Sequence, residues 1–182
     1  MRPILSLRVV ALAGSALLLG GCGAMHHHHH GAPGARAVLE PTRGNTTAGT
    51  VMFHAVEGGL MLHVRVSGLK PGQEHGFHVH EKGDCSSGDG MSTGGHFNPT
   101  GKPHGHPGQG EHHAGDLPAL KADAEGKVDV RLHAHGITLG SGATSVVGRG
   151  LIVHAQPDDY KTQPTGNSGA RVACAVITAM PA

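Results

Sequence analysis

The sequence predicts an all-β fold in which antiparallel sheets form a sandwich or a barrel. Three observations support this. Short runs of β-branched and apolar residues alternate with turn signals along the chain. Glycine (31 residues) and proline (11 residues) make up nearly a quarter of the 182 residues, which is typical of many turns and argues against a helical bundle. No segment after residue 36 sustains a helical hydrophobic period.

The expected strands begin near residue 36 and are separated by turns rich in glycine and proline. In one of them Met61, His63 and Arg65 alternate with apolar residues, which is typical of a half-buried antiparallel strand. The strands are expected at residues 37–40, 49–56, 60–66, 75–81, 119–122, 128–134, 150–154 and 171–178. Between them lie two long glycine-rich stretches, 82–118 and 155–170, and loops of that length in a compact domain are usually functional.

The N-terminal segment has the features of an export signal. Arg2 and Arg8 precede an apolar run at 9–19, which is too short to span a bilayer comfortably and ends in small residues. The residues Leu-Gly-Gly-Cys at 19–22 resemble a bacterial lipoprotein signal with lipidation at Cys22; a simple signal peptide cleaved nearby is the alternative. We expect an exported protein in the periplasm, tethered to a bacterial membrane, with the outer membrane favoured.

A tract of histidines, His26 to His30, follows the signal directly. An engineered tag and a native metal-scavenging or tethering tail both remain open for it. The chain therefore divides into a lipoprotein-type signal peptide at 1–21, a histidine-rich flexible tether at 22–35 and one folded domain at 36–182. The charge is nearly balanced, 14 basic against 13 acidic residues, so nothing indicates a nucleic-acid partner.

The three cysteines fit an oxidising compartment. If Cys22 is acylated, Cys85 and Cys174 remain as an even pair. A bridge between them would close a loop of about ninety residues and stabilise the fold by about 4 to 5 kcal/mol in chain-entropy models. Two unrelated buried thiols are the alternative.

The 18 histidines point to metal before any motif is considered. His78 and His80 are two apart on an expected strand, so both imidazoles lie on one face. The long loop that follows concentrates further potential ligands, which packing explains poorly and an ion explains well. These are His96, His104, His106, His112, His113 and Asp116. His154, at the end of an apolar run, would on its own be a satisfied strand histidine.

Several of these blocks resemble the copper/zinc superoxide dismutase family, in its bacterial periplasmic lipoprotein type. The resemblance covers about residues 36 to 180, with the motifs in order and at matching spacing. It implies a Greek-key antiparallel β-sandwich or flattened barrel with two long functional loops. The blocks are Gly-Phe-His-Val-His-Glu at 76–81, Gly-His-Phe-Asn-Pro at 95–99, His-Ala-Gly-Asp-Leu at 113–117, Gly-Arg-Gly-Leu-Ile-Val-His at 148–154 and Gly-Asn-Ser-Gly-Ala-Arg-Val-Ala-Cys at 166–174.

The resemblance implies a role for each matching residue. His96 would be shared between copper and zinc, Asp158 would join His78 to His104, and Cys85 would pair with Cys174. Arg171 occupies the place of the guanidinium that guides the anion. The copper ligands would be His78, His80, His96 and His154, and the zinc ligands His96, His104, His113 and Asp116.

The implied activity is the conversion of superoxide to dioxygen and hydrogen peroxide, with His96 and Arg171 as the catalytic residues. A non-catalytic copper/zinc-binding or buffering protein on the same fold is the alternative. The expected partners are the superoxide anion, a membrane through Cys22, and a second copy in a possible homodimer. Six further histidines are expected to face outward, to hydrogen-bond or to add loop contacts, and these are His54, His63, His106, His112, His133 and His135.

Overall fold

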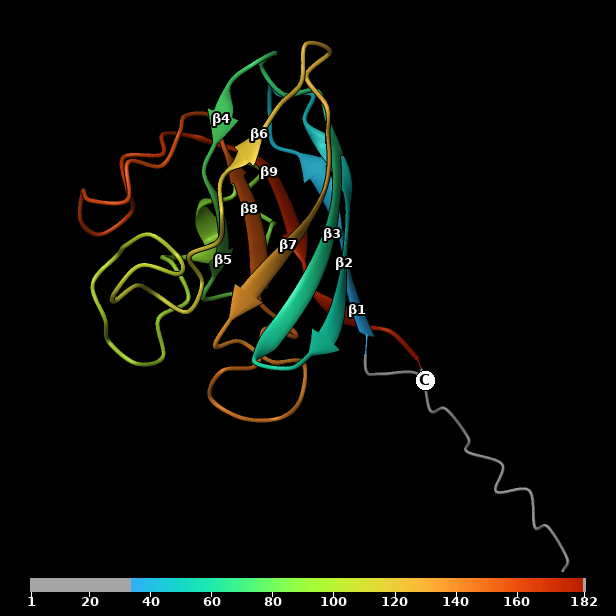
Figure 1. Ribbon diagram of the computed structural model, residues 1–182. Coiled ribbons are helices and arrows are strands. Elements are labelled where there is room, and N and C mark those ends of the chain that lie inside the picture. Colours follow the sequence, from blue (N-terminus) through green and yellow to red (C-terminus); the bar gives the residue numbers. More distant parts are fainter. Residues whose placement is uncertain (1–33, 182) are drawn as a thin grey trace, which may run out of the picture.

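The structure is a computed structural model that describes residues 34–181 (Figure 1). The signal peptide, Cys22 and the tract from His26 to His30 lie outside the described residues. Within the described part no helix is long and apolar enough to cross a membrane. A single 3-10 turn, η1 (Met91–Thr93), is the only helical element of residues 34–181, so the prediction of an all-β fold is confirmed.

Ten strands make up the fold, and every pairing between them is antiparallel. They are β1 (Gly34–Pro41), β2 (Ala48–Val56), β3 (Gly59–Ser67), β4 (Glu74–His75), β5 (Phe77–His80), β6 (Leu120–Lys121), β7 (Val128–His135), β8 (Gly150–His154), β9 (Arg171–Val176) and β10 (Thr178–Ala179).

The main sheet curls into a half-barrel with the order β5-β8-β9-β1-β2-β3-β7, and β10 adds to the edge of β1 (Figure 1). Strand β1 joins the two halves: its first residues pair with β2, whereas Glu40 and Pro41 pair with β9. Neighbours such as β5 and β8, or β3 and β7, are not consecutive in the chain, and these crossovers give the Greek-key connection. β4 and β6 form a separate two-stranded sheet.

The core lies on the concave side of this curled sheet. Alternate residues of β3 are buried, among them Leu60, Leu62 and Val64, because successive side chains of a strand point to opposite faces. The chain has three phenylalanines, and all three are buried: Phe53, Phe77 and Phe97. Although the chain has few aromatic residues, every phenylalanine contributes its large apolar area to the core.

The expected strand at 75–81 is interrupted at Gly76. The Gly76 N–H donates to the carbonyl of Gln156, 2.8 Å away, and a side chain at Gly76 would collide with Ser168 and with the His78 ring. As a result His75 pairs with Leu120 in the small sheet, whereas Phe77 to His80 pair with β8. The break makes β5, the strand with His78 and His80, the edge of the main sheet, next to the long loops.

A disulfide joins Cys85 to Cys174, which are 89 positions apart. It ties the first part of the long loop to β9, so the expected pairing of the two cysteines is confirmed. The same loop contains η1 and lies beside the histidines of β5, and the bridge therefore anchors one wall of the candidate site.

Candidate metal centre

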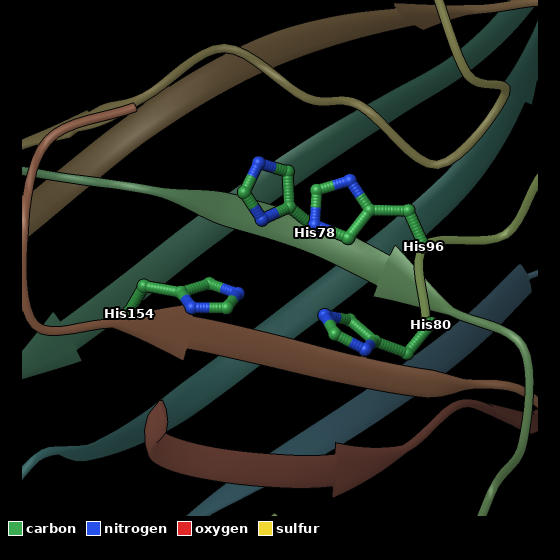
Figure 2. A group of neighbouring side chains, drawn as sticks. All are labelled: His78, His80, His96 and His154. Carbon is green, nitrogen blue, oxygen red and sulfur yellow. The ribbon is translucent and has the colours of Figure 1, made fainter. Parts of the chain in front are cut away.

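Four buried imidazoles converge at the outer edge of the half-barrel (Figure 2). His78 and His80 come from β5, with Val79 between them turned into the core. His154 ends the neighbouring strand β8, and His96 approaches from the long loop, where an isolated bridge pairs it with His80. One ligand atom from each ring lies within 4.8 Å of the others.

Each of these rings keeps one nitrogen without a hydrogen-bond partner, although the nitrogens are buried. They are His78 Nδ1, His80 Nε2, His96 Nε2 and His154 Nε2. A buried polar atom without a partner costs about 1 to 3 kcal/mol, so four in one place need a common explanation. A cation bound among them satisfies all four, because each nitrogen presents a lone pair when the ring is neutral. The residues thus fit a metal ion.

The opposite nitrogens of three of these rings are held by fixed acceptors, which set the orientation of each imidazole. His80 Nδ1 donates to the carbonyl of Gly94 at 2.9 Å, and His154 Nδ1 donates to the carbonyl of Gly169 at 3.2 Å. His78 Nε2 donates to Asp158 Oδ2 at 2.6 Å. These contacts select the tautomer whose free nitrogen faces the shared centre.

A second buried cluster adjoins the first and contains His96, His104, His113 and Asp116. Asp116 Oδ1 lies 2.9 Å from His96 Nδ1, 3.0 Å from His104 Nδ1 and 3.4 Å from His113 Nδ1. These separations are close to the edge of roughly 3.3 Å that a tetrahedron with bonds near 2.0 Å would have. Three imidazoles and one carboxylate in this arrangement suit a closed zinc site.

His96 belongs to both clusters. Its Nε2 is the unpartnered atom that faces the first cluster, whereas its Nδ1 faces Asp116 in the second. The ring stacks on His78, with centroids 3.9 Å apart, and its side chain is almost completely buried. One imidazole thus has a separate nitrogen available to each of two neighbouring ions.

Asp158 lies behind both clusters and connects them by a second route. One carboxylate oxygen accepts from His78 Nε2, and the other accepts from His104 Nε2 at 2.9 Å. The N–H of Tyr160 also donates to Oδ1, at 2.7 Å. Gly166 leaves the space that this carboxylate needs, since a side chain at that position would overlap Asp158 and the His104 ring.

Burial and hydrogen bonding shift the pKa values of the four rings of the first cluster and of His104 in opposite directions. Burial lowers the pKa of His78 from its ordinary 6.5 to about 4, and burial also lowers the pKa of His80, His96 and His154. Burial also acts to lower the pKa of His104, but its hydrogen bonds to Asp116 and Asp158 outweigh this and raise the pKa to about 9. The first cluster therefore holds neutral rings at neutral pH, as a cation requires.

We expect the metal-free protein to lose thermal stability as the pH falls from 6.5 toward 4. In that range the unfolded chain takes up protons at His78, His80, His96 and His154. The folded chain does not, because burial lowers the pKa of these four rings. Each unit of pKa shift corresponds to about 1.4 kcal/mol. His104 acts in the opposite sense: its contribution is present below pH 6.5 and is lost as the pH rises through about 9. Tm measured on metal-free protein at pH 7, 5.5 and 4.5 checks this, and a level Tm contradicts it.

Arg171, the first residue of β9, lies at the mouth of the first cluster. Its guanidinium donates to the carbonyls of Gly90 and Gly94 at 2.6 and 2.7 Å, and to Thr93 Oγ1 at 2.8 Å. The side chain lines a cavity of about 270 Å³ together with His80 and His154. A fixed cation at a small cavity beside the four imidazoles attracts small anions to that point.

The structure brings together every residue that the resemblance assigned to a metal ligand set. His106 and His112 stay outside both clusters: His106 donates to its neighbour Pro107 and His112 donates to the carbonyl of His113. Sequence reasoning missed Gly94, whose carbonyl holds both His80 and Arg171, and Gln163, whose amide makes two hydrogen bonds of 2.8 Å to the backbone of His104. No sequence motif predicts these contacts, because one is made by a backbone carbonyl and the other by a single glutamine in a loop.

The fold and the site together define a metal-binding β-protein in which two histidine clusters share one imidazole. Residues 47–177 match the copper/zinc superoxide dismutase family (SODC), and the chain belongs to this family. The family membership and the buried clusters together indicate copper and zinc as the metals.

Among curated proteins, the chain is 46% identical to the superoxide dismutase-like protein YojM of Bacillus subtilis (strain 168) over 123 residues, which are 65% of this chain and 63% of that protein. The match thus spans less than two thirds of the relative's length.

Solved structures of SOD-like proteins are similar to this chain in fold and in sequence. A SOD-like protein from Bacillus subtilis superposes with a TM-score of 0.73 at 40% identity, covering 80% of this chain and 99% of that one. The clock protein EA4 superposes with a TM-score of 0.73 at 41% identity, covering 84% and 98%. A double mutant of the Bacillus subtilis SOD-like protein gives a TM-score of 0.72 at 42% identity, covering 79% and 96%.

Proposed function

We propose that this protein is a copper- and zinc-dependent superoxide dismutase, which converts two superoxide anions and two protons into dioxygen and hydrogen peroxide. The observation that carries the proposal is the set of four buried unpartnered nitrogens beside a fixed guanidinium. A site that only stores metal has no use for an anion-attracting cation at its mouth, whereas a reaction on superoxide does.

Copper, when bound, supplies the one-electron chemistry, and the chain's own residues prepare the site for it. His78, His80, His96 and His154 would hold that ion, and His104, His113 and Asp116 would hold zinc together with His96. The carbonyls of Gly94 and Gly169 and the carboxylate of Asp158 keep the rings in place. Burial keeps the four imidazoles of the first cluster neutral and excludes bulk water except on the side of the cavity that Arg171 lines.

Two residues would act on the substrate. Arg171 draws the anion into the cavity and orients it there, because its guanidinium is fixed by three acceptors of the loop. His96 Nε2 is the atom at which the chain takes up a proton and gives it back, since Nδ1 of the same ring is engaged in the second cluster. The other protons come from solvent.

Replacing Arg171 by alanine tests the proposal. We expect the variant to bind both metals and to lose about tenfold or more of its superoxide dismutation rate, the scale of electrostatic steering. Its rate should also depend less on ionic strength than that of the parent. A competition assay for superoxide, with metal analysis of the same samples, checks this, and Arg171→Lys should recover part of the rate because it restores the charge.

Two results would contradict this reading. Fully metal-loaded parent protein without dismutation would favour the alternative, a copper/zinc-binding or buffering protein on the same fold. Equal rates and equal salt dependence for parent and Arg171→Ala would remove Arg171 from the reaction. An exposed arginine of the opposite sheet face, changed as Arg65→Ala, is the matched control and should leave the rate unchanged.

We further propose that the protein is exported to the periplasm and tethered to a membrane by a lipid on Cys22. The support is the sequence alone, with Arg2 and Arg8 before a short apolar run at 9–19 and Leu-Gly-Gly-Cys at 19–22. Mass spectrometry of the mature N-terminus tests it: a lipid-modified Cys22 as the first residue is the expected result, and an unmodified terminus at another residue contradicts it.

A further inference from the structure

The solvent-facing side of β2, β3 and β7 carries a set of histidine and methionine side chains that the dismutase reaction does not use. In the sheet register His54 lies opposite Met61, and Met61 lies opposite His133 on the next strand. All three residues point away from the core, since Phe53, Leu60 and Ala134 beside them are buried. The two buried clusters lie at the other edge of the main sheet, on β5 and β8.

The central feature of this surface is the pair His133 and His135. They are two apart on β7, and their rings meet edge to face with centroids 4.0 Å apart. His133 Nδ1 lies 3.0 Å from His135 Nε2. Two ligands of one ion with bonds near 2.0 Å, at angles between a right angle and a tetrahedral angle, stand roughly 2.8 to 3.3 Å apart. In the ion-free chain a hydrogen bond joins the two nitrogens, and their separation also lies within the range for two ligands of one ion, which would replace that bond.

Met61 supplies the donor that selects the metal. Directly opposed residues of neighbouring antiparallel strands have Cβ atoms about 4.5 to 5.5 Å apart, so the thioether of Met61 can reach an ion held at His133. Thioether sulfur is a soft ligand, which favours copper(I) over zinc, calcium or magnesium.

The charged neighbours of this surface favour the same ion. Arg131 lies two residues before His133 on the same face of β7, and it penalises a doubly charged ion more than a singly charged one. The acidic group of the face, Asp129, is not free to compensate, because it is engaged with His63 at 2.7 Å and with Arg65 at 3.4 Å. His63 is withdrawn from the ligand set by the same contact.

We propose that His133, His135 and Met61 bind a copper(I) ion on the outer face of the sheet, separate from the two buried clusters. The sequence alone predicts that both histidines face outward or hydrogen-bond, without a metal. The site is half-exposed, so copper reaches it without passing the buried centre, and the protein can hold copper on its surface as well as inside. The proposal does not depend on dismutase activity.

Copper(I) titration against the chromogenic chelator bicinchoninate tests the proposal. The protein is the full chain with both buried clusters already loaded, and the five histidines from His26 to His30 are changed to serine so that this tract does not compete. We expect the parent of this series to bind one further copper(I) per chain. The double variant His133→Asn, His135→Asn should lose that equivalent, whereas the matched control His63→Asn should keep it.

The variant Met61→Leu distinguishes a copper(I) site that includes the thioether from a metal site formed by the two histidines alone. We expect it to weaken copper(I) binding and to leave copper(II) binding unchanged, since only the monovalent ion needs the soft donor. In the nuclear magnetic resonance spectrum, redox-inert silver(I) should shift the Met61 methyl signal before that of the exposed Met91. Equal copper(I) uptake by the parent and the double histidine variant, or equal copper(I) affinity of Met61→Leu, overturns the proposal.

Discussion

Asp116→Asn is expected to abolish zinc binding and to lower the free energy of unfolding of the metal-free protein by about 3 kcal/mol. Both oxygens of this carboxylate are in use. Oδ1 faces the three imidazoles, whereas Oδ2 accepts the backbone N–H groups of Gly105 and His113 at 3.1 and 2.9 Å. An asparagine must turn its NH₂ either toward the imidazoles or toward the two backbone N–H groups. In the first orientation the imidazoles lose their oxygen, and in the second the NH₂ faces two N–H donors.

The burial of Asp116 makes this mismatch costly. The residue is 3% exposed, and the pKa of its carboxyl is held well below the usual range because hydrogen bonds from His104, His113 and His96 outweigh burial. The variant therefore loses a charge that three neighbouring rings stabilise. Zinc content by elemental analysis and urea unfolding of metal-free protein measure the two effects.

Asp129→Asn is the matched control for Asp116→Asn. Asp129 also contacts a histidine, His63, but its side chain is 66% exposed. Exposed ion pairs contribute about 0 to 1 kcal/mol, so this variant should keep its zinc and nearly all of its stability. Normal zinc content in Asp116→Asn, or an equal loss of stability in the two variants, contradicts the assignment of Asp116 as a ligand.

Removing the disulfide with the double variant Cys85→Ala, Cys174→Ala should lower the free energy of unfolding by about 4 to 5 kcal/mol. The bridge closes a loop of 89 positions, and in the chain-entropy account the unfolded chain regains that freedom when the bridge is lost. Activity should fall as well, because the bridged loop carries the carbonyls of Gly90 and Gly94 that hold Arg171.

Urea unfolding with its m-value, followed by the superoxide assay, measures both effects of disulfide removal. Ser87→Ala is the matched control, since Ser87 lies in the same loop and its hydroxyl makes exposed hydrogen bonds to the hydroxyl and to the backbone N–H of Ser92. It should change stability by less than about 1 kcal/mol. A double cysteine variant that is no less stable than Ser87→Ala would show that the bridge contributes nothing to stability.

Much of the fold follows from local patterns, because strands such as β3 alternate apolar and polar residues, whereas β8 is a short apolar run between turns. The strand expected at 150–154 has the bounds of β8, and β3 extends the expected 60–66 by one residue at each end. The interruption at Gly76 was not predictable, since it depends on Ser168 and Gln156, which only the tertiary fold brings there.

The candidate site was predictable to a different extent. The spacing of His78 and His80 places both on one face of a strand, and the concentration of histidines in the long loop indicates an ion there. Which loop residues approach which cluster was implied by the resemblance alone. Met61 and His133 lie opposite each other only in the observed pairing register of β3 and β7. A shift of that register by one residue would turn every side chain of one strand to the other face of the sheet. Periodicity within a strand does not report that register.

Asp158 and His96 connect the two clusters by two separate routes. His96 links them directly, and the carboxylate of Asp158 links His78 on one side to His104 on the other. An ion seated in either cluster thus fixes rings that belong to both. Linkage then requires symmetry: whatever factor copper adds to the affinity for zinc, zinc must add to the affinity for copper. The order in which the two metals arrive cannot change the free energy of the final, doubly loaded protein.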